Sequence, residues 1–258
     1  MITLLVLPFA AALILGFVHV YFGAFVLRRG IIFVDLALAQ WAALGYIVGS
    51  VMHLHSPFLL FVTGFAFTLI ASALLTLFTK LYRTVNLQEA VIGVMYLIAN
   101  AVGLALISMN GFEGHMIEEI LVGDLLFVSL NEVLFSGVLY LCIGGLLYSL
   151  HRYFLRNQSL MSTFLFYSLF GLVVTSSVKM VGVLLVFSLL VLPVLTVYLF
   201  SNCIRSHLYY GWLISFFGSI LGLLGAVFLD LPPSYSIILV LCLFWVLSVI
   251  YKFCFDHS

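Results

Sequence analysis

The chain has 258 residues, of which 66% are hydrophobic and 7% are charged, and its formal net charge is zero. This composition excludes an ordinary soluble domain, and no stretch is basic enough to bind nucleic acid. Apolar segments of membrane-spanning length recur from one end to the other. The composition therefore predicts an all-α, polytopic membrane protein in which residues 1–258 form a single transmembrane domain.

Nine apolar segments are predicted as membrane helices. In chain order they span residues 3–27, 31–52, 57–79, 88–108, 132–151, 161–175, 180–201, 209–229 and 235–252. The sixth and seventh are separated only by the polar stretch "TSSVK" inside one continuous apolar pattern, so eight or nine helices are expected.

The basic residues predict the orientation of these helices. Basic residues follow the first, third, fifth and seventh segments and end the ninth, and only Lys179 departs from this pattern. Because basic residues favour the cytoplasmic side, the pattern predicts an external N-terminus and a cytoplasmic C-terminus.

Acidic and imidazole side chains gather in the loops of the opposite side. If residues 114–122 are helical, the spacing of His115, Glu118 and Glu119 puts all three side chains on one face, where they could ligate a divalent cation. A solvated polar loop is the alternative. His53 and His55 form a weaker pair in another loop.

Asp35 and Gln40 are the polar residues of the second apolar segment. A carboxylate inside a membrane is costly, so Asp35 is a candidate residue of a translocation pathway that favours cations. Gln40 could add an amide oxygen as a ligand. The alternative is that Asp35 lies near the interface, paired or in contact with water, six residues from Arg29.

Proline and glycine predict two packing features. Pro193 lies inside an apolar segment, where it removes a backbone hydrogen bond and permits a helix kink. The pairs Gly45–Gly49 and Gly218–Gly222 allow close helix contact, either within the chain or with another subunit.

Four segments of the chain together carry a resemblance to a known family. They are "RRGIIFVDLALAQWAALG" (28–45), "NLQEAVIGVMYLIANAVGLALIS" (86–108), "ILVGDLLFVS" (120–129) and "SSVKMVGVLLVFSLLVLPVLTVYLF" (176–200). In this order they resemble elements of the membrane subunits of ABC-type zinc and manganese importers. The first resembles the segment near that family's second helix, and the second is similar to its helix that begins with an acidic residue followed by Ile-Gly.

The resemblance implies a permease without chemistry of its own, which imports zinc, manganese or iron across the cytoplasmic (inner) membrane. It implies a homodimer, two copies of a separate ATPase and an extracytoplasmic metal-binding protein, with the metal ion as cargo and no permanent cofactor. Loops facing the ATPase would contain Arg83, Glu89, Arg152 and Arg156. A self-contained secondary transporter or channel for cations is the alternative, with Asp35 or Lys179 as its coupling residue.

The chain departs from the family at two places. The resemblance implies an Asp and a His four residues apart as metal ligands, but the matching positions hold Leu36 and Gln40, and Asp35 stands one place earlier. One position turns a helix by about 100°, so Asp35 would face differently from the family's carboxylate. The cytoplasmic segment after Arg156 is also shorter than in the family.

Overall fold

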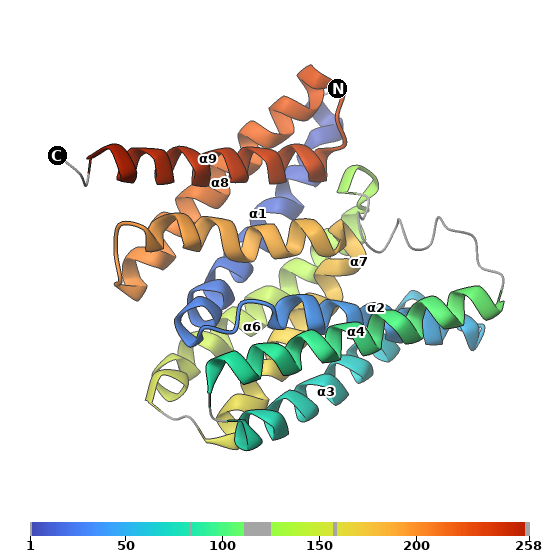
Figure 1. The fold of residues 1–258 in the computed structure, drawn as a ribbon. Helices are drawn as coiled ribbons and strands as arrows, with labels where there is room; N and C mark the ends of the chain where they lie inside the picture. The colour runs from blue at the N-terminus through green and yellow to red at the C-terminus, as the bar shows by residue number, and fades with distance from the viewer. Residues whose placement is uncertain (1, 83, 111–124, 157–158, 256–258) are drawn as a thin grey trace. The chain divides into compact units, whose positions relative to one another are not determined.

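The computed structural model describes residues 2–82, 84–110, 125–156 and 159–255, and all regular elements in these ranges are helices (Figure 1). They are α1 (Ile2–Arg29), α2 (Val34–Val51), α3 (Pro57–Leu81), α4 (Val85–Asn110), the short 3-10 helix η1 (Leu125–Phe127), α6 (Leu130–Arg156), α7 (Leu160–Tyr198), α8 (Ile204–Leu229) and α9 (Pro233–Phe255). Within the described residues, eight helices are long and apolar enough to cross a membrane. The expected all-α membrane fold is confirmed.

The predicted sixth and seventh helices both lie within α7, where they meet at a kink, and the residues expected to separate them, 176–179, are helical. The polar side chains there do not end the helix because they bond to its own backbone. Thr175 Oγ1 donates to the carbonyl of Gly171 at 2.7 Å, and Ser177 Oγ donates to that of Val173 at 2.6 Å. These bonds satisfy the hydroxyl groups inside the membrane without any loop.

The kink that divides α7 into two helices falls at Gly182, three residues after the predicted gap. The backbone of this residue is not helical, with φ 78° and ψ 164°. These angles belong to a region that is essentially restricted to glycine, so the side chain-free residue is what permits the break. Pro193 lies within the helix beyond Gly182, and the kink predicted there stays a prediction.

The described backbone groups into two compact units. One contains α1, η1, the start of α6, α7 from Met180 onward, α8 and α9; the other contains α2, α3, α4, most of α6, and α7 up to Lys179. The chain first enters the second unit at Gly30, where φ is 73°, and finally leaves it after Lys179, three residues before Gly182. Two of the passages between the units therefore lie within three residues of a glycine with positive φ.

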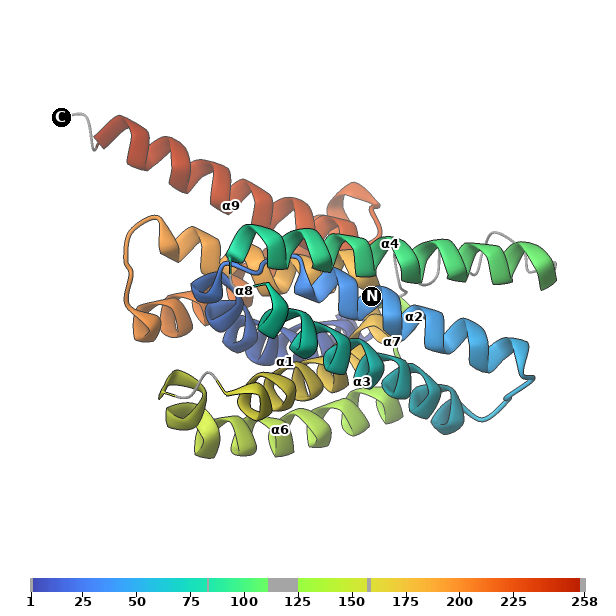
Figure 2. The same cartoon turned by 60° about the horizontal axis from the view of Figure 1, so that its bottom comes forward.

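In the unit that contains α2, this helix packs against both α3 and α4, and the three run alongside one another in both views (Figures 1 and 2). Gly45 allows the contact with α3, because a Cβ there would lie 2.6 Å from the carbonyl oxygen of Thr63 and 2.7 Å from Gly64 Cα. On the α4 side, Trp41 Nε1 donates to the carbonyl of Met95 at 3.1 Å.

In the unit that contains α8, this helix packs against α1 and α9. Gly218 and Gly222 face α9, because a Cβ at Gly222 would lie 2.5 Å from Ile237 Cα. Both predicted glycine pairs therefore serve contacts within the chain: Gly49 faces α3 as Gly45 does, with a Cβ there 2.7 Å from Thr63 Oγ1.

The orientation predicted from the basic residues can be tested at Cys203, which is exposed between α7 and α8. Hydrogen bonds from the backbone amides of Arg205 and Ser206 lower the pKa of this thiol, so its thiolate fraction at neutral pH rises and thiol reagents should react readily. With Cys203 as the only cysteine, we expect a membrane-impermeant maleimide to label inside-out vesicles and to leave right-side-out vesicles unlabelled.

The matched control places a single cysteine on the opposite side. His55 is exposed in the connection between α2 and α3, so a chain whose only cysteine comes from His55→Cys should be labelled in right-side-out vesicles. The reverse pattern at both positions would invert the predicted topology.

Candidate functional site

Asp35 lies in the first turn of α2 and is completely buried, with 0% of its surface exposed. Neither carboxylate oxygen has a hydrogen-bond partner among the described residues. This environment does not fit the interpretation of Asp35 as an interfacial residue that is paired or in contact with water. It is instead an isolated acid inside the unit that contains α2.

A buried carboxylate without partners is unfavourable when charged, unless a cation or a proton neutralises it. The N-terminus of α2 offers partial compensation, because the helix dipole stabilises negative charge in the first turn. Asp35 therefore has the chemistry of a group that takes up a cation or a proton, and the structure assigns it no structural hydrogen bond.

Gln40 lies on α2, five residues after Asp35, and is 7% exposed. Five residues turn a helix by about 500°, which leaves the two side chains about 140° apart around its axis. Leu36, at the position where the family resemblance implies a carboxylate, is half-buried. Asp35 and Gln40 thus share one helix but do not form a common ligand face.

Two hydrogen bonds that do not involve Asp35 help to hold α2 in place. Glu89 Oε1, in the first turns of α4, accepts a hydrogen bond of 3.1 Å from the backbone N–H of Ile32, just before α2 begins. Tyr46 Oη donates to the carbonyl of Thr175 in α7 at 2.9 Å. Neither bond could be predicted from the sequence, because nothing in the spacing of these residues links them.

The predicted metal ligands cannot be placed. His115, Glu118 and Glu119 lie outside the described residues, and elsewhere in the described parts of the chain no group of three His, Cys, Asp or Glu side chains could hold a metal ion. His53 and His55 are exposed in the connection between α2 and α3.

The residues predicted to face an ATPase are described only in part. Arg83 lies outside the described residues, and Arg152 and Arg156 belong to the last turns of the α6 backbone. Glu89 is half-buried and engaged with Ile32. Its carboxylate joins the start of α4 to the segment that enters α2.

The comparison with family models decides the identity of the chain. The model described as the ABC 3 transport family matches residues 1–252, which is almost the entire sequence. The chain belongs to the ABC 3 transport family. It is a multi-pass membrane protein of a family whose members are permease subunits of ABC transporters and are not themselves enzymes; in bacteria such proteins lie in the inner membrane.

Two curated proteins are similar to this ABC 3 family chain. The "High-affinity zinc uptake system membrane protein ZnuB" of Buchnera aphidicola is 26% identical, over 94% of this chain and 95% of that protein. A "Probable metal transport system membrane protein" of Chlamydia muridarum is 28% identical over 64% of this chain, and the match covers 60% of that protein's length. The family resemblance expected from the four segments is confirmed.

A solved structure supports the fold. A chain of PsaBC from Streptococcus pneumoniae, determined in complex with Fab, superposes with a TM-score of 0.78 and covers 95% of this chain and 90% of its own. The two are 21% identical in sequence. At this identity the likeness establishes that the ABC 3 family chain shares that fold.

Proposed function

We propose that this chain is the membrane-spanning permease of an ABC importer for a divalent metal ion: zinc, manganese or iron. The observation that carries the proposal is the match to the ABC 3 transport family over residues 1–252, joined by the similarity to a zinc uptake protein over 94% of the chain. Acidic and imidazole side chains in the predicted external loops support a cationic cargo.

The proposed assembly contains two copies of the permease, two copies of a separate ATPase and an extracytoplasmic protein that delivers the metal. The ATPase supplies the energy, and the permease alternates its access between the two sides of the membrane. Arg83, Arg152 and Arg156 face the ATPase, and Glu89 holds the start of α4 to the link before α2 through Ile32.

Asp35 and Gln40 are the proposed pathway residues. The support for Asp35 is its isolation: a carboxylate that is fully buried and without a hydrogen-bond partner does not contribute to stability. A residue that costs stability and has no structural bond is more readily explained by a role in moving cations. His115, Glu118 and Glu119 are proposed as an external site where the ion first binds.

The test is metal uptake in cells that lack their own zinc and manganese importers. The chain, expressed with its ATPase partner, should restore uptake of radioactive zinc or manganese, and the purified chain alone should hydrolyse no ATP. The control is an ATPase whose catalytic glutamate is replaced by Gln, with which uptake should fall to background.

Uptake that survives inactivation of the ATPase would contradict the proposal and favour a secondary transporter or channel. The stoichiometry is tested separately by measuring the mass of the purified complex. Two permease chains with an ATPase dimer are expected, and a stable complex with one permease would contradict the proposed assembly.

A further inference from the structure

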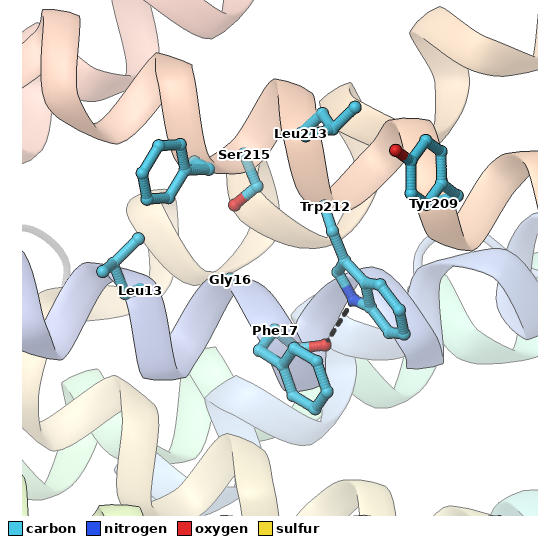
Figure 3. Close-up of a pocket in the computed structure, with 8 residues that line it drawn as sticks. Leu13, Gly16, Phe17, Tyr209, Trp212, Leu213 and Ser215 are labelled. Atoms are coloured by element: carbon cyan, nitrogen blue, oxygen red, sulfur yellow. Dashed lines mark hydrogen bonds between the residues drawn. The ribbon is translucent and has the colours of Figure 1, made fainter.

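A groove opens between α1 and α8, inside the unit that both helices belong to (Figure 3). Its volume is about 400 Å³, within the range of about 300–1,000 Å³ that is typical of ligand pockets. Its walls come from both helices and include Leu13, Gly16 and Phe17 of α1 and Tyr209, Trp212 and Phe216 of α8.

The floor of the groove is closely packed, and the indole N–H of Trp212 has a hydrogen-bond partner. Trp212 Nε1 donates to the carbonyl oxygen of Phe17 at 2.9 Å (Figure 3), and the two rings stack with centroids 4.6 Å apart. Gly16 brings the helices together, because a Cβ there would overlap Ser215 Oγ. The walls therefore present rings and aliphatic groups, which favour an apolar occupant.

The groove is open to the surroundings along its rim. Phe17 is 54% exposed and Tyr209 is 60% exposed, although both belong to membrane helices. Large apolar side chains exposed in this way contact lipid or another protein in the membrane.

The apolar stripe of each helix ends at an arginine. On α8, Arg205 precedes Tyr209 and Trp212 by four and seven residues, a spacing that places all three on one face. On α1, Leu27 packs against a buried cluster formed by Val20, Ala24 and Val194. Ile204 and Trp212 of α8 pack against the same cluster.

Arg28 and Arg205 therefore lie at the same end of the helix pair. Arg28 directly follows Leu27 and Arg205 directly follows Ile204, two of the residues that pack against this cluster. The two arginines are exposed. The lining of the groove is therefore mainly apolar, and the two arginines lie further along the helix pair, beyond the Tyr209 end of the groove.

We propose that the groove binds an anionic phospholipid, with an acyl chain against Phe17 and Trp212 and the phosphate at Arg28 and Arg205. An amphiphile with one negative head group complements both parts of the site, since arginine forms charge-assisted hydrogen bonds with phosphate. A second copy of the chain fits less well. A symmetric contact would bring the same patch against itself and would place arginine near arginine.

The experiment uses Trp212 as a fluorescent reporter in the full-length chain, with Trp41→Phe and Trp245→Phe removing the other two tryptophans. The chain is reconstituted in vesicles of phosphatidylcholine with a minor share of phosphatidylglycerol. Lipid composition stays constant, and bromine atoms, which quench tryptophan, are carried by the acyl chains of one lipid or the other.

We expect brominated phosphatidylglycerol to quench Trp212 at least about fivefold more per mole than brominated phosphatidylcholine, because each basic residue near the membrane surface favours anionic lipid by about this factor. The pair Arg28→Gln and Arg205→Gln should remove the preference, and Arg28→Lys with Arg205→Lys should retain most of it. Lys80→Gln, a charge change at the end of α3, should leave it unchanged.

Two outcomes would overturn the proposal. Equal quenching per mole by both lipids would show ordinary contact with the bilayer. Quenching by neither would show that protein covers the groove. A second reporter guards against misfolded variants: a chain with Trp245 on α9 as its only tryptophan should be quenched without head-group preference, before and after the arginine changes.

Discussion

Replacing Asp35 with leucine is expected to abolish metal uptake and, at the same time, to stabilise the folded chain. Leucine keeps the branched shape of the side chain but removes two oxygen atoms that are buried without hydrogen-bond partners. Relieving one unsatisfied buried polar group is worth about 1–3 kcal/mol. In a chain of this size, each kcal/mol corresponds to a rise in Tm of about 2–4 °C. Uptake of radioactive zinc or manganese and thermal unfolding in detergent are measured on the same preparations.

Two companion variants separate the contributions of shape, charge and burial. Asp35→Asn keeps the shape and polarity, so it should abolish uptake without the gain in stability. Ser162→Ala is the matched control: Ser162 is also fully buried with an unsatisfied hydroxyl oxygen, and we expect slightly higher stability with normal uptake. If Asp35→Leu transports metal at the normal rate, Asp35 is not a pathway residue.

The helical framework could be predicted because the signal for it is global. Long apolar segments must satisfy their backbone groups internally, so composition and length alone locate membrane helices. The predicted segment 57–79 and the observed α3 at Pro57–Leu81 differ only at one end. The helix ends are less predictable, as α6 shows by continuing to Arg156 beyond the predicted end at residue 151.

Polarity located the break in the long helix only approximately, at residues 176–179 and not at Gly182. The stretch after Gly171 contains three consecutive hydroxyl residues and suggested a loop, but in a helix these hydroxyls donate to carbonyls three or four residues earlier. A glycine in an apolar run carries two meanings, close packing or an unusual backbone. Gly45 has the first role and Gly182 the second, and only the local backbone angles distinguish them.

The residues of the candidate site could be predicted from the sequence, but their surroundings could not. A carboxylate in an apolar segment marks a functional candidate from sequence alone. Its isolation depends on the side chains that other helices bring near α2, and two helices that contact or bond to α2, namely α4 and α7, are distant from it in the sequence. The hydrogen bond between Ile32 and Glu89, which are 57 residues apart, shows the same limit.

Asp35 and Gly182 are two positions where the fold carries a local free-energy cost. The oxygens of Asp35 are buried without hydrogen bonds, and the backbone of Gly182 departs from helical geometry. Such costs persist only where the surrounding structure maintains them, and they concentrate at functional positions. The break in α7 also has a geometric purpose, because a straight helix of 39 residues would be about 58 Å long, against about 30 Å for the apolar part of a bilayer.

Replacing Gly182 with alanine should therefore be among the most damaging single substitutions in the chain. The angles φ 78° and ψ 164° are essentially unavailable to residues with a Cβ, at a cost of about 1–3 kcal/mol. The alternative, a continuous helix through residue 182, would redirect one part of α7 relative to the other. We expect a lower Tm, less protein in the membrane and loss of uptake. Gly144→Ala is the matched control, because Gly144 is helical and a Cβ there would have no neighbour within 4 Å. It should raise helix stability by about 0.5–1 kcal/mol and leave uptake normal. Equal behaviour of the two variants would mean that the break at Gly182 is not required for the folded chain.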